Sequence, residues 1–215
     1  MRRVGWILVL AFGVTGCGVN RQEKIRDYAE DGLHLYQCGD YRHARESFEA
    51  ALVLAPGDVT LQYDLAQCYD RTGRAEKAET LYRDCLQRAP NHADCRHALT
   101  VLLVRQGRRE EAVRLVQDWL AREPNLSSPY AEDGYLWHDF GDLPRARGRL
   151  EQALALNLRD NRALVELGLI YEEMHYPDRA LSLYEQALRY QPYQPDVEQR
   201  LGRLRSQGVG SPKPN

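Results

Sequence analysis

Apolar side chains recur at helical spacing along nearly the whole chain. They return every three, four or seven residues, which is the period that places side chains on one face of an α-helix. Residues 59 to 92 show the pattern twice, with apolar positions at Leu61, Leu65 and Tyr69 and then at Ala78, Tyr82, Cys85 and Leu86. The pattern therefore predicts two amphipathic helices that pack as a hairpin.

The pattern repeats with a fixed period of 34 residues. Equivalent positions mark the ends of successive units at Pro56, Pro90, Pro124, Leu158 and Pro192. The same frame aligns a column of alanines at Ala44, Ala78, Ala112, Ala146 and Ala180. Residues in a second, mostly small column are Gly32, Ala66, Thr100, Gly134 and Gly168. Small side chains let two helix axes approach closely, so these columns indicate a repeated helical hairpin.

Glycines stand where the first helix of four units must end, at Gly39, Gly73, Gly107 and Gly141. Glycine suits this place because it adopts the left-handed conformation of a helix terminus. Asp40 and Asp142 follow directly and are predicted N-caps of the next helices. In the fifth unit His175 replaces the glycine, and we expect a slightly altered turn there.

The third and fourth units depart most from the common frame. Thr100 and Trp119 occupy small-residue columns of the third unit, and Leu158 replaces proline in the fourth. We expect the packing of this middle stretch to be the least regular.

The columns resemble the signature of the tetratricopeptide repeat (TPR), most closely in the fifth unit with Leu164, Leu167, Gly168, Tyr171, Ala180, Tyr184 and Pro192. The resemblance covers residues 25 to 207 and implies an all-α fold class. The fold implied is an α-solenoid of five helical hairpins plus a C-terminal capping helix, wound as a right-handed superhelix. The expected units are 25–58, 59–92, 93–126, 127–160 and 161–194, followed by a cap at 195–207 and a disordered tail at 208–215.

The first residues have the pattern of an export signal. Arg2 and Arg3 precede a short apolar run that is too short to span a bilayer. The run ends in Val14-Thr15-Gly16-Cys17, which resembles the lipobox of bacterial lipoproteins. This resemblance implies a signal peptide at 1–16, fatty acylation of Cys17 and a tether at 17–24. The alternative is a short membrane anchor with an incidental cysteine.

Charge is nearly balanced, which argues against a nucleic-acid partner. Lys plus Arg total 29 and Asp plus Glu total 31, so the chain has neither a polycationic surface nor an acidic tail.

In TPR proteins the first helices line a concave face, and fixed places of each unit contact the ligand. Transferred to this chain, those places predict a partner-binding groove that includes Leu33, Tyr36, Tyr63, Gln67, Asp70, Arg71, His97, Val101, Arg105, Tyr135, His138, Leu169 and Glu172. Seven apolar or aromatic groove residues are expected to be exposed as one patch: Leu33, Tyr36, Tyr63, Val101, Val104, Tyr135 and Leu169.

We expect the groove to bind a peptide or helix of another protein. The alternative is that these residues pack against a second copy of the chain or a bent N-terminal segment. Chaperone-binding TPR proteins grip a C-terminal carboxylate with Lys and Asn, whereas this chain has Ala29 and Leu33 in those columns. The carboxylate clamp is therefore absent.

The sequence has no motif that indicates catalysis. It lacks a Gly-rich phosphate loop, His-Glu-x-x-His, Gly-x-Ser-x-Gly and Cys-x-x-Cys. A site borrowed from the groove would have to use His138 with Asp139 and Tyr135. We therefore expect no enzyme, no cofactor and no small-molecule substrate.

Four cysteines remain beside Cys17. Cys85 and Cys95 lie on either side of the turn at Pro90, so they either form a disulfide or remain buried thiols. We expect Cys38 and Cys68 to remain thiols. A zinc site at Cys85, His92, Cys95 and His97 is disfavoured, because their spacing does not match the usual paired Cys and His motifs.

These features together predict a non-catalytic, lipid-anchored interaction module of the bacterial cell envelope. If the cell has two membranes, Gly18 after the cysteine favours the outer membrane, with the repeats facing the periplasm. Two alternatives are a self-associating structural lipoprotein and a regulatory subunit of an envelope enzyme.

Overall fold

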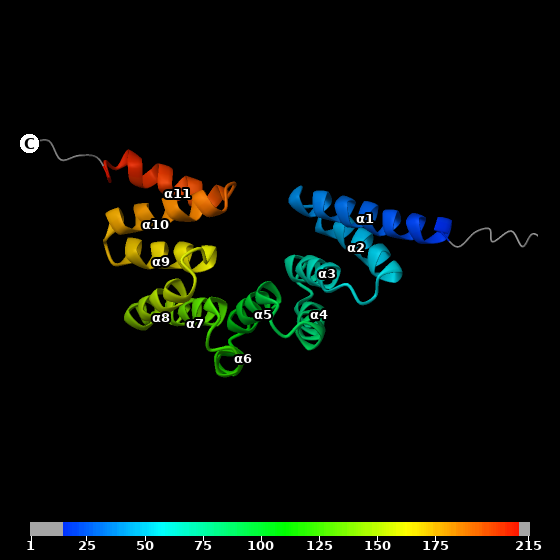
Figure 1. Ribbon diagram of the computed structural model, residues 1–215, viewed down its shortest axis with the longest axis horizontal. Coiled ribbons are helices and arrows are strands. Elements are labelled where there is room, and N and C mark those ends of the chain that lie inside the picture. Colours follow the sequence, from blue (N-terminus) through cyan, green and yellow to red (C-terminus); the bar gives the residue numbers. More distant parts are fainter. Residues whose placement is uncertain (1–14, 211–215) are drawn as a thin grey trace, which may run out of the picture. The chain divides into compact units, whose positions relative to one another are not determined.

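The computed structural model describes residues 15 to 210, with side chains from residue 20. Within this range the chain is all-helical (Figure 1), and the helices are α1 (Thr15–Gln37), α2 (Tyr41–Leu54), α3 (Val59–Arg71), α4 (Ala75–Arg88), α5 (Ala93–Arg105), α6 (Arg109–Arg122), α7 (Ser127–Asp139), α8 (Leu143–Leu156), α9 (Asn161–Glu173), α10 (Pro177–Tyr190) and α11 (Pro195–Ser206). The predicted all-α helical-hairpin fold is confirmed. The hand of the superhelix stays a prediction.

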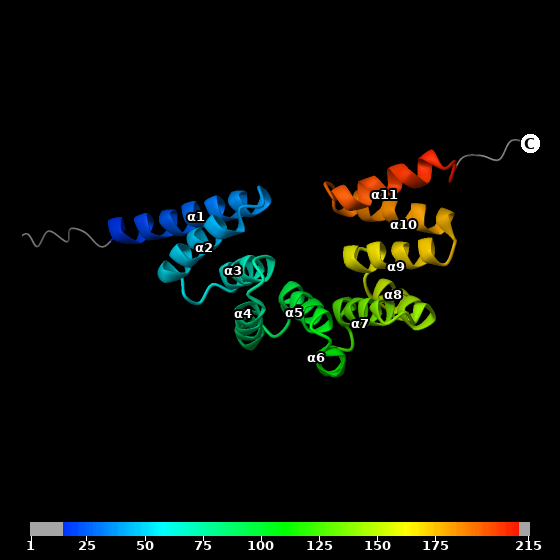
Figure 2. The ribbon, with the colours of Figure 1, turned by 180° about the vertical axis from the view of Figure 1, so that it is seen from behind.

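The chain forms two compact units, residues 1–98 and 99–215, and the division falls inside α5. In the first unit α1 packs against α2, α2 against α3, and α3 against α4. In the second unit α7 and α8, and then α9 and α10, form hairpins, and α10 also packs against α11 (Figure 2). These helices thus contact their neighbours in sequence, as stacked hairpins require.

Glycines in the small column allow the two helices of a hairpin to touch. A Cβ added to Gly32 would lie 2.7 Å from the ring of Phe48, and one added to Gly168 would lie 2.5 Å from the ring of Tyr184. Both rings belong to the second helix of the same unit and are almost fully buried. The ring fills the space that a side chain at the glycine would occupy, so a larger residue at the glycine position would displace the ring.

Two of the helix N-caps are formed by the predicted aspartates. Asp40 and Asp142 accept hydrogen bonds from the backbone N–H groups of His43 and Arg145, so both predicted N-caps are confirmed. The altered turn expected at His175 is wrong. This histidine takes the left-handed conformation with φ of 61°. Tyr176 N–H donates to Tyr171 O, and the residue after each turn glycine makes the equivalent hydrogen bond.

Both ends of the described chain are ordered. Residues 17–24 belong to α1, which begins at Thr15, and Arg21 Nε donates to Leu54 O at 3.0 Å; their role as a tether stays a prediction. The tail expected from residue 208 is ordered as far as Gly210, whose N–H donates to Asp178 at 3.3 Å, while Val209 packs against the core.

The N-terminal targeting predictions fall outside what the structure describes. Residues 1–14 of the expected signal peptide, the side chain of Cys17 and residues 211–215 are not part of the described structure. Of the helices that are described, none combines the length and apolar character that a membrane span needs.

Candidate functional site

A pocket of about 210 Å³ lies between α1 and α3 in the first unit. Its walls come from both helices and its floor from α2, and the lining residues are Leu33, Tyr36, Phe48, Tyr63, Asp64 and Gln67. Four of these were predicted groove residues, which the stacking of neighbouring hairpins brings together although α1 and α3 are a unit apart in sequence.

Hydrogen bonds fix the polar side of this pocket. Tyr36 Oη donates to Gln67 Oε1 at 3.0 Å, and Gln67 Nε2 donates to Tyr63 Oη at 2.6 Å. Both tyrosine rings are held by other aromatic rings, since Tyr36 packs edge-on against Tyr41 at 5.1 Å and Tyr63 lies 6.2 Å from Tyr82. The walls are thus arranged before any partner arrives, which lowers the entropy cost of binding.

Arg71, another predicted groove residue, lies at the α1–α2 side of the same unit. Its guanidinium donates to Tyr41 Oη at 2.7 Å and lies 5.0 Å from the centre of the Tyr41 ring. Arg71 therefore stabilises the aromatic group beside the pocket.

Asp64 is the unusual member of the pocket. Burial, followed by the negative charge of Asp58, raises the pKa of the Asp64 carboxyl to about 6. Burial also raises the pKa of Tyr63 to about 12, so this hydroxyl stays protonated. A half-buried carboxylate on the wall of an apolar pocket accepts hydrogen bonds or a positive charge from whatever enters.

The sequence analysis missed Asp64, although a signal was present. Asp64 stands three residues after Leu61 and four before Cys68, which places it on the apolar face of α3. A lone acidic residue on such a face is the signal that could have identified it.

The expected exposure of the groove is largely wrong. Leu33 is 48% exposed, but the other six side chains of the predicted patch are half-buried: Tyr36, Tyr63, Val101, Val104, Tyr135 and Leu169. Within each unit, first helices of adjacent hairpins lie close together, and their side chains cover one another.

In the second unit the predicted groove residues are engaged with neighbouring side chains. His138 contacts Glu166 at 3.2 Å and Glu173 at 2.9 Å, and the hydrogen bond with Glu166 is the main cause that raises its pKa to about 9. Leu169 packs against the hydrophobic core. Burial, above all, raises the pKa of Tyr135 to about 12.

Glu172 joins three helices of the second unit. It accepts a hydrogen bond from Tyr184 at 2.6 Å and pairs with Arg200 at 3.3 Å and with Arg203. This predicted groove residue therefore holds α10 and α11 to α9. The remaining predicted polar groove residues, Asp70, His97 and Arg105, also have partners in the folded chain.

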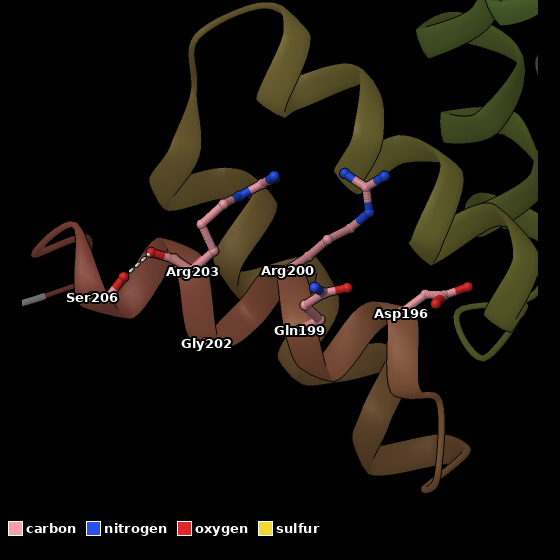
Figure 3. Close-up of a pocket in the computed structure, with 6 residues that line it drawn as sticks. All are labelled: Asp196, Gln199, Arg200, Gly202, Arg203 and Ser206. Atoms are coloured by element: carbon pink, nitrogen blue, oxygen red, sulfur yellow. Dashed lines mark hydrogen bonds between the residues drawn. The ribbon is translucent and has the colours of Figure 1, made fainter.

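A larger pocket of about 580 Å³ lies over α11, lined by Asp196, Gln199, Arg200, Gly202, Arg203 and Ser206. All six residues belong to this one helix (Figure 3). Gly202 stands in the small column, but a Cβ added to it would meet nothing within 4 Å. Within the described residues, this polar face of α11 is therefore left uncovered at Gly202.

The two alternatives left open for Cys85 and Cys95 are decided in the structure. The two residues form a disulfide with their Cα atoms 6.6 Å apart, joining the last turn of α4 to the first turn of α5. Cys38 is an exposed thiol and Cys68 a buried one, and burial raises the pKa of the Cys68 thiol to about 12.

Two family models match the chain. A model of the middle TPR-like domain of cilia and flagella-associated protein 70 matches residues 35–138, and a tetratricopeptide-repeat model matches residues 139–195. No protein with a curated description matches.

Solved structures show the same fold. A thermophilic TPR protein of Thermus thermophilus is 26% identical over 85% of this chain and 99% of that chain, with a TM-score of 0.66. PilF of Pseudomonas aeruginosa is 19% identical over 88% of this chain and 86% of that chain, with a TM-score of 0.56. Yeast Tom70 is 17% identical over 93% of this chain and 44% of that chain, with a TM-score of 0.61.

The matches extend over most of the helical array, and the packing within it explains them. Helices pair in hairpins that recur every 34 residues, and the glycine of the first helix packs against a large apolar side chain of the second, Phe48, Leu150 or Tyr184. From these two lines of observation, the chain is a tetratricopeptide-repeat protein.

Proposed function

We propose that the chain is a membrane-anchored scaffold of the bacterial cell envelope, which binds a peptide or helix of a partner protein against α1 and α3. TPR folds serve as protein-interaction scaffolds, which supports the general class of function. The partner's place on the surface is argued from the pocket between these helices.

The size and lining of this pocket carry the proposal. Its volume of about 210 Å³ is below the roughly 300–1,000 Å³ typical of small-molecule sites. It suits one apolar side chain of a protein partner, which would rest on Phe48 and contact Leu33 at the rim. Neither a nucleophile with an adjacent base nor a phosphate-binding loop is among its six lining residues.

Asp64 indicates which chemical groups the bound peptide or helix should carry. Its carboxyl faces the same pocket as the apolar Leu33 and Phe48. We therefore propose that the bound segment carries an apolar side chain next to a lysine, an arginine or another N–H donor. Such a donor would offset the desolvation of the carboxylate, which the pocket alone leaves uncompensated.

Photo-crosslinking tests the binding site. A photoreactive residue at Leu33 is expected to capture one partner protein in cells, whereas the same residue at Leu158, which is 73% exposed in the second unit, is expected to capture none. The partner is identified by mass spectrometry. Identical products from both positions would contradict a site at α1 and α3.

Substitution then tests the energetics with purified partner. Leu33→Asp is expected to weaken binding at least about tenfold, because it replaces an apolar contact at the pocket rim with a charge that the bound apolar side chain would desolvate, while Leu158→Asp leaves binding unchanged. Circular dichroism of both variants should match the parent chain. If the crosslinked partner proves to be a second copy of the chain, the protein is a self-associating structural lipoprotein instead.

The anchor is a separate part of the proposal, and its support is the run from Arg2 to Cys17 in the sequence. Cys17→Ser is expected to leave unprocessed precursor and to abolish fatty-acid labelling. A labelled protein of mature size in this variant would refute the lipid anchor while leaving the binding site untouched.

A further inference from the structure

The turn between α4 and α5 brings together three side chains that can bind a metal ion. Cys85, His92 and Cys95 each offer one ligand atom, and these atoms all lie within 4.8 Å of one another. Both cysteines are fully buried and joined as a disulfide, whereas His92 is half-buried. His97, which the sequence placed with them, is not part of this group.

The imidazole of His92 is held beside the cysteines by two contacts. Its Nδ1 accepts a hydrogen bond from the backbone N–H of Cys95 at 3.2 Å, which caps the first turn of α5. On the other side its ring lies 5.7 Å from the ring of Tyr63. To bind a metal ion held by the two sulfurs, Nδ1 would exchange its hydrogen bond from Cys95 N–H for a bond to the metal, because the other ring nitrogen carries the proton of the neutral imidazole.

We propose that Cys85, Cys95 and His92 form a redox-gated site for a soft divalent metal ion such as Zn²⁺, closed while the disulfide exists and opened by its reduction. A dithiol or phosphine reductant supplies two electrons, the S–S bond breaks, and each sulfur takes up one proton. Metal binding then releases both protons, because thiolates are the ligands. An added small-molecule disulfide, acting as the oxidant, accepts the two electrons and is reduced to thiols, the S–S bond re-forms and the metal ion is released.

The ligand set suits Zn²⁺ in number, spacing and charge. Tetrahedral zinc has bonds of about 2.3 Å to sulfur and about 2.0 Å to nitrogen, so its ligand atoms lie roughly 3.5–4 Å apart. The ligand atoms already lie within 4.8 Å of one another, and reduction lets the sulfurs separate. Two thiolates, a neutral imidazole and Zn²⁺ sum to zero charge, so the buried site holds no uncompensated ion. Water fills the fourth position.

Cobalt spectroscopy on the full-length chain tests the proposal, in a background with Cys17→Ser and Cys38→Ser, which removes these two thiols as competing ligands. Oxidised protein is expected to show no change with Co²⁺. Protein reduced with a phosphine is expected to bind one equivalent and to show the sulfur-to-cobalt charge-transfer absorption of thiolate ligation. Zn²⁺ should then displace Co²⁺ and abolish the band.

Single substitutions assign the ligands. Cys85→Ser and Cys95→Ser are each expected to halve the charge-transfer intensity, and His92→Ala to weaken Zn²⁺ binding at least about tenfold, since even outer-shell changes cost that much. Cys68→Ser is the matched control, because this thiol lies outside the group, and it should bind metal like the background protein.

Two results would overturn the proposal: reduced protein with native helix content and no charge-transfer band, or a band that persists at full intensity in Cys85→Ser. If reduction lowers the helix content by itself, Zn²⁺ is expected to restore it in the background protein and not in His92→Ala. Failure of Zn²⁺ to restore the helices would equally contradict the proposed site.

Discussion

At the scale of single residues, the partner of a buried ionisable group decides what its burial costs. His138 has Glu166 and Glu173 as partners, and its pKa is raised to about 9, so the charged imidazolium is favoured. Asp64 has Asp58 as the neighbouring charge, and its pKa is raised to about 6, so its charged form is disfavoured. The first arrangement favours the charged imidazolium in the folded state, and the second leaves in the pocket a carboxyl group whose charged form burial disfavours.

Asp64→Asn is therefore expected to stabilise the protein at neutral pH. The folded-state pKa lies above the unfolded value, so the folded state binds the proton more tightly and stability falls as pH rises through about 6. After solvent screening of a half-buried group, we expect a gain of about 1 kcal/mol at about pH 7.5 and no gain at about pH 3.5. Urea unfolding at the two pH values measures it, and an equal gain at both would rule out the titration of Asp64 as the cause.

At the scale of elements, helix ends repeat a backbone pattern more faithfully than a residue type. At Gly39 φ is 81° and Asp40 N–H donates to Leu35 O at 2.9 Å, and at Gly141 φ is 82° with the equivalent bond from Asp142 to Trp137 O. His175 adopts the same left-handed conformation although, unlike glycine, it carries a side chain. Tertiary packing of the hairpin fixes the turn, and the histidine bears the strain.

His175→Gly should consequently stabilise the chain by about 0.5–1 kcal/mol, the left-handed cost of a non-glycine residue less the extra entropy of glycine. Gly141→Ala places a side chain in the equivalent turn and should lose about 1 kcal/mol. Thermal unfolding of both variants provides the comparison. A destabilised His175→Gly would show that the imidazole makes a contribution larger than the strain.

Two glycines of the same column test whether available space or helix propensity determines the change in stability when glycine is replaced by alanine. Gly168→Ala places a Cβ 2.5 Å from the Tyr184 ring and should cost about 1–3 kcal/mol through overpacking. Gly202→Ala points into open space on α11 and should gain about 0.5–1 kcal/mol from helix propensity. Denaturant midpoints of the pair are the measurement, and similar losses for both would mean that α11 is covered in solution.

At the scale of the whole molecule, the stabilising contacts are made between helices that are adjacent in sequence. Helices of each unit pack on adjacent helices, and the chain separates into units at residues 1–98 and 99–215. The division lies in the third repeat, where Thr100 and Trp119 occupy small-residue columns and where the sequence predicted the least regular packing.

A local defect should therefore stay local. In Gly168→Ala, amide hydrogen exchange is expected to accelerate in α9 and α10, which meet at Tyr184, while α2 and α3 keep their parental protection. Mass-spectrometric hydrogen exchange resolves the helices separately. Equal loss of protection in α2 and α3 would show that the array unfolds as one cooperative body.

The sequence by itself determined the all-α repeat fold, the left-handed turns at Gly39, Gly73, Gly107 and Gly141, and the N-caps at Asp40 and Asp142. Those features follow from residues close in the chain and from a period that recurs, so local chemistry is sufficient to predict them. Glycines in one column and rings in another also specify which helix faces meet.

Only the tertiary structure decided which predicted groove residues are engaged and what lies among them. Glu172 binds arginines of α11, Asp64 lies in the pocket, and Cys85 joins Cys95 beside His92. Each of these depends on distances across a turn or between separate helices, which a pattern of residue types does not specify. The pattern says which side of a helix is covered, whereas the packed structure fixes how deeply each polar group is buried and which partner it meets.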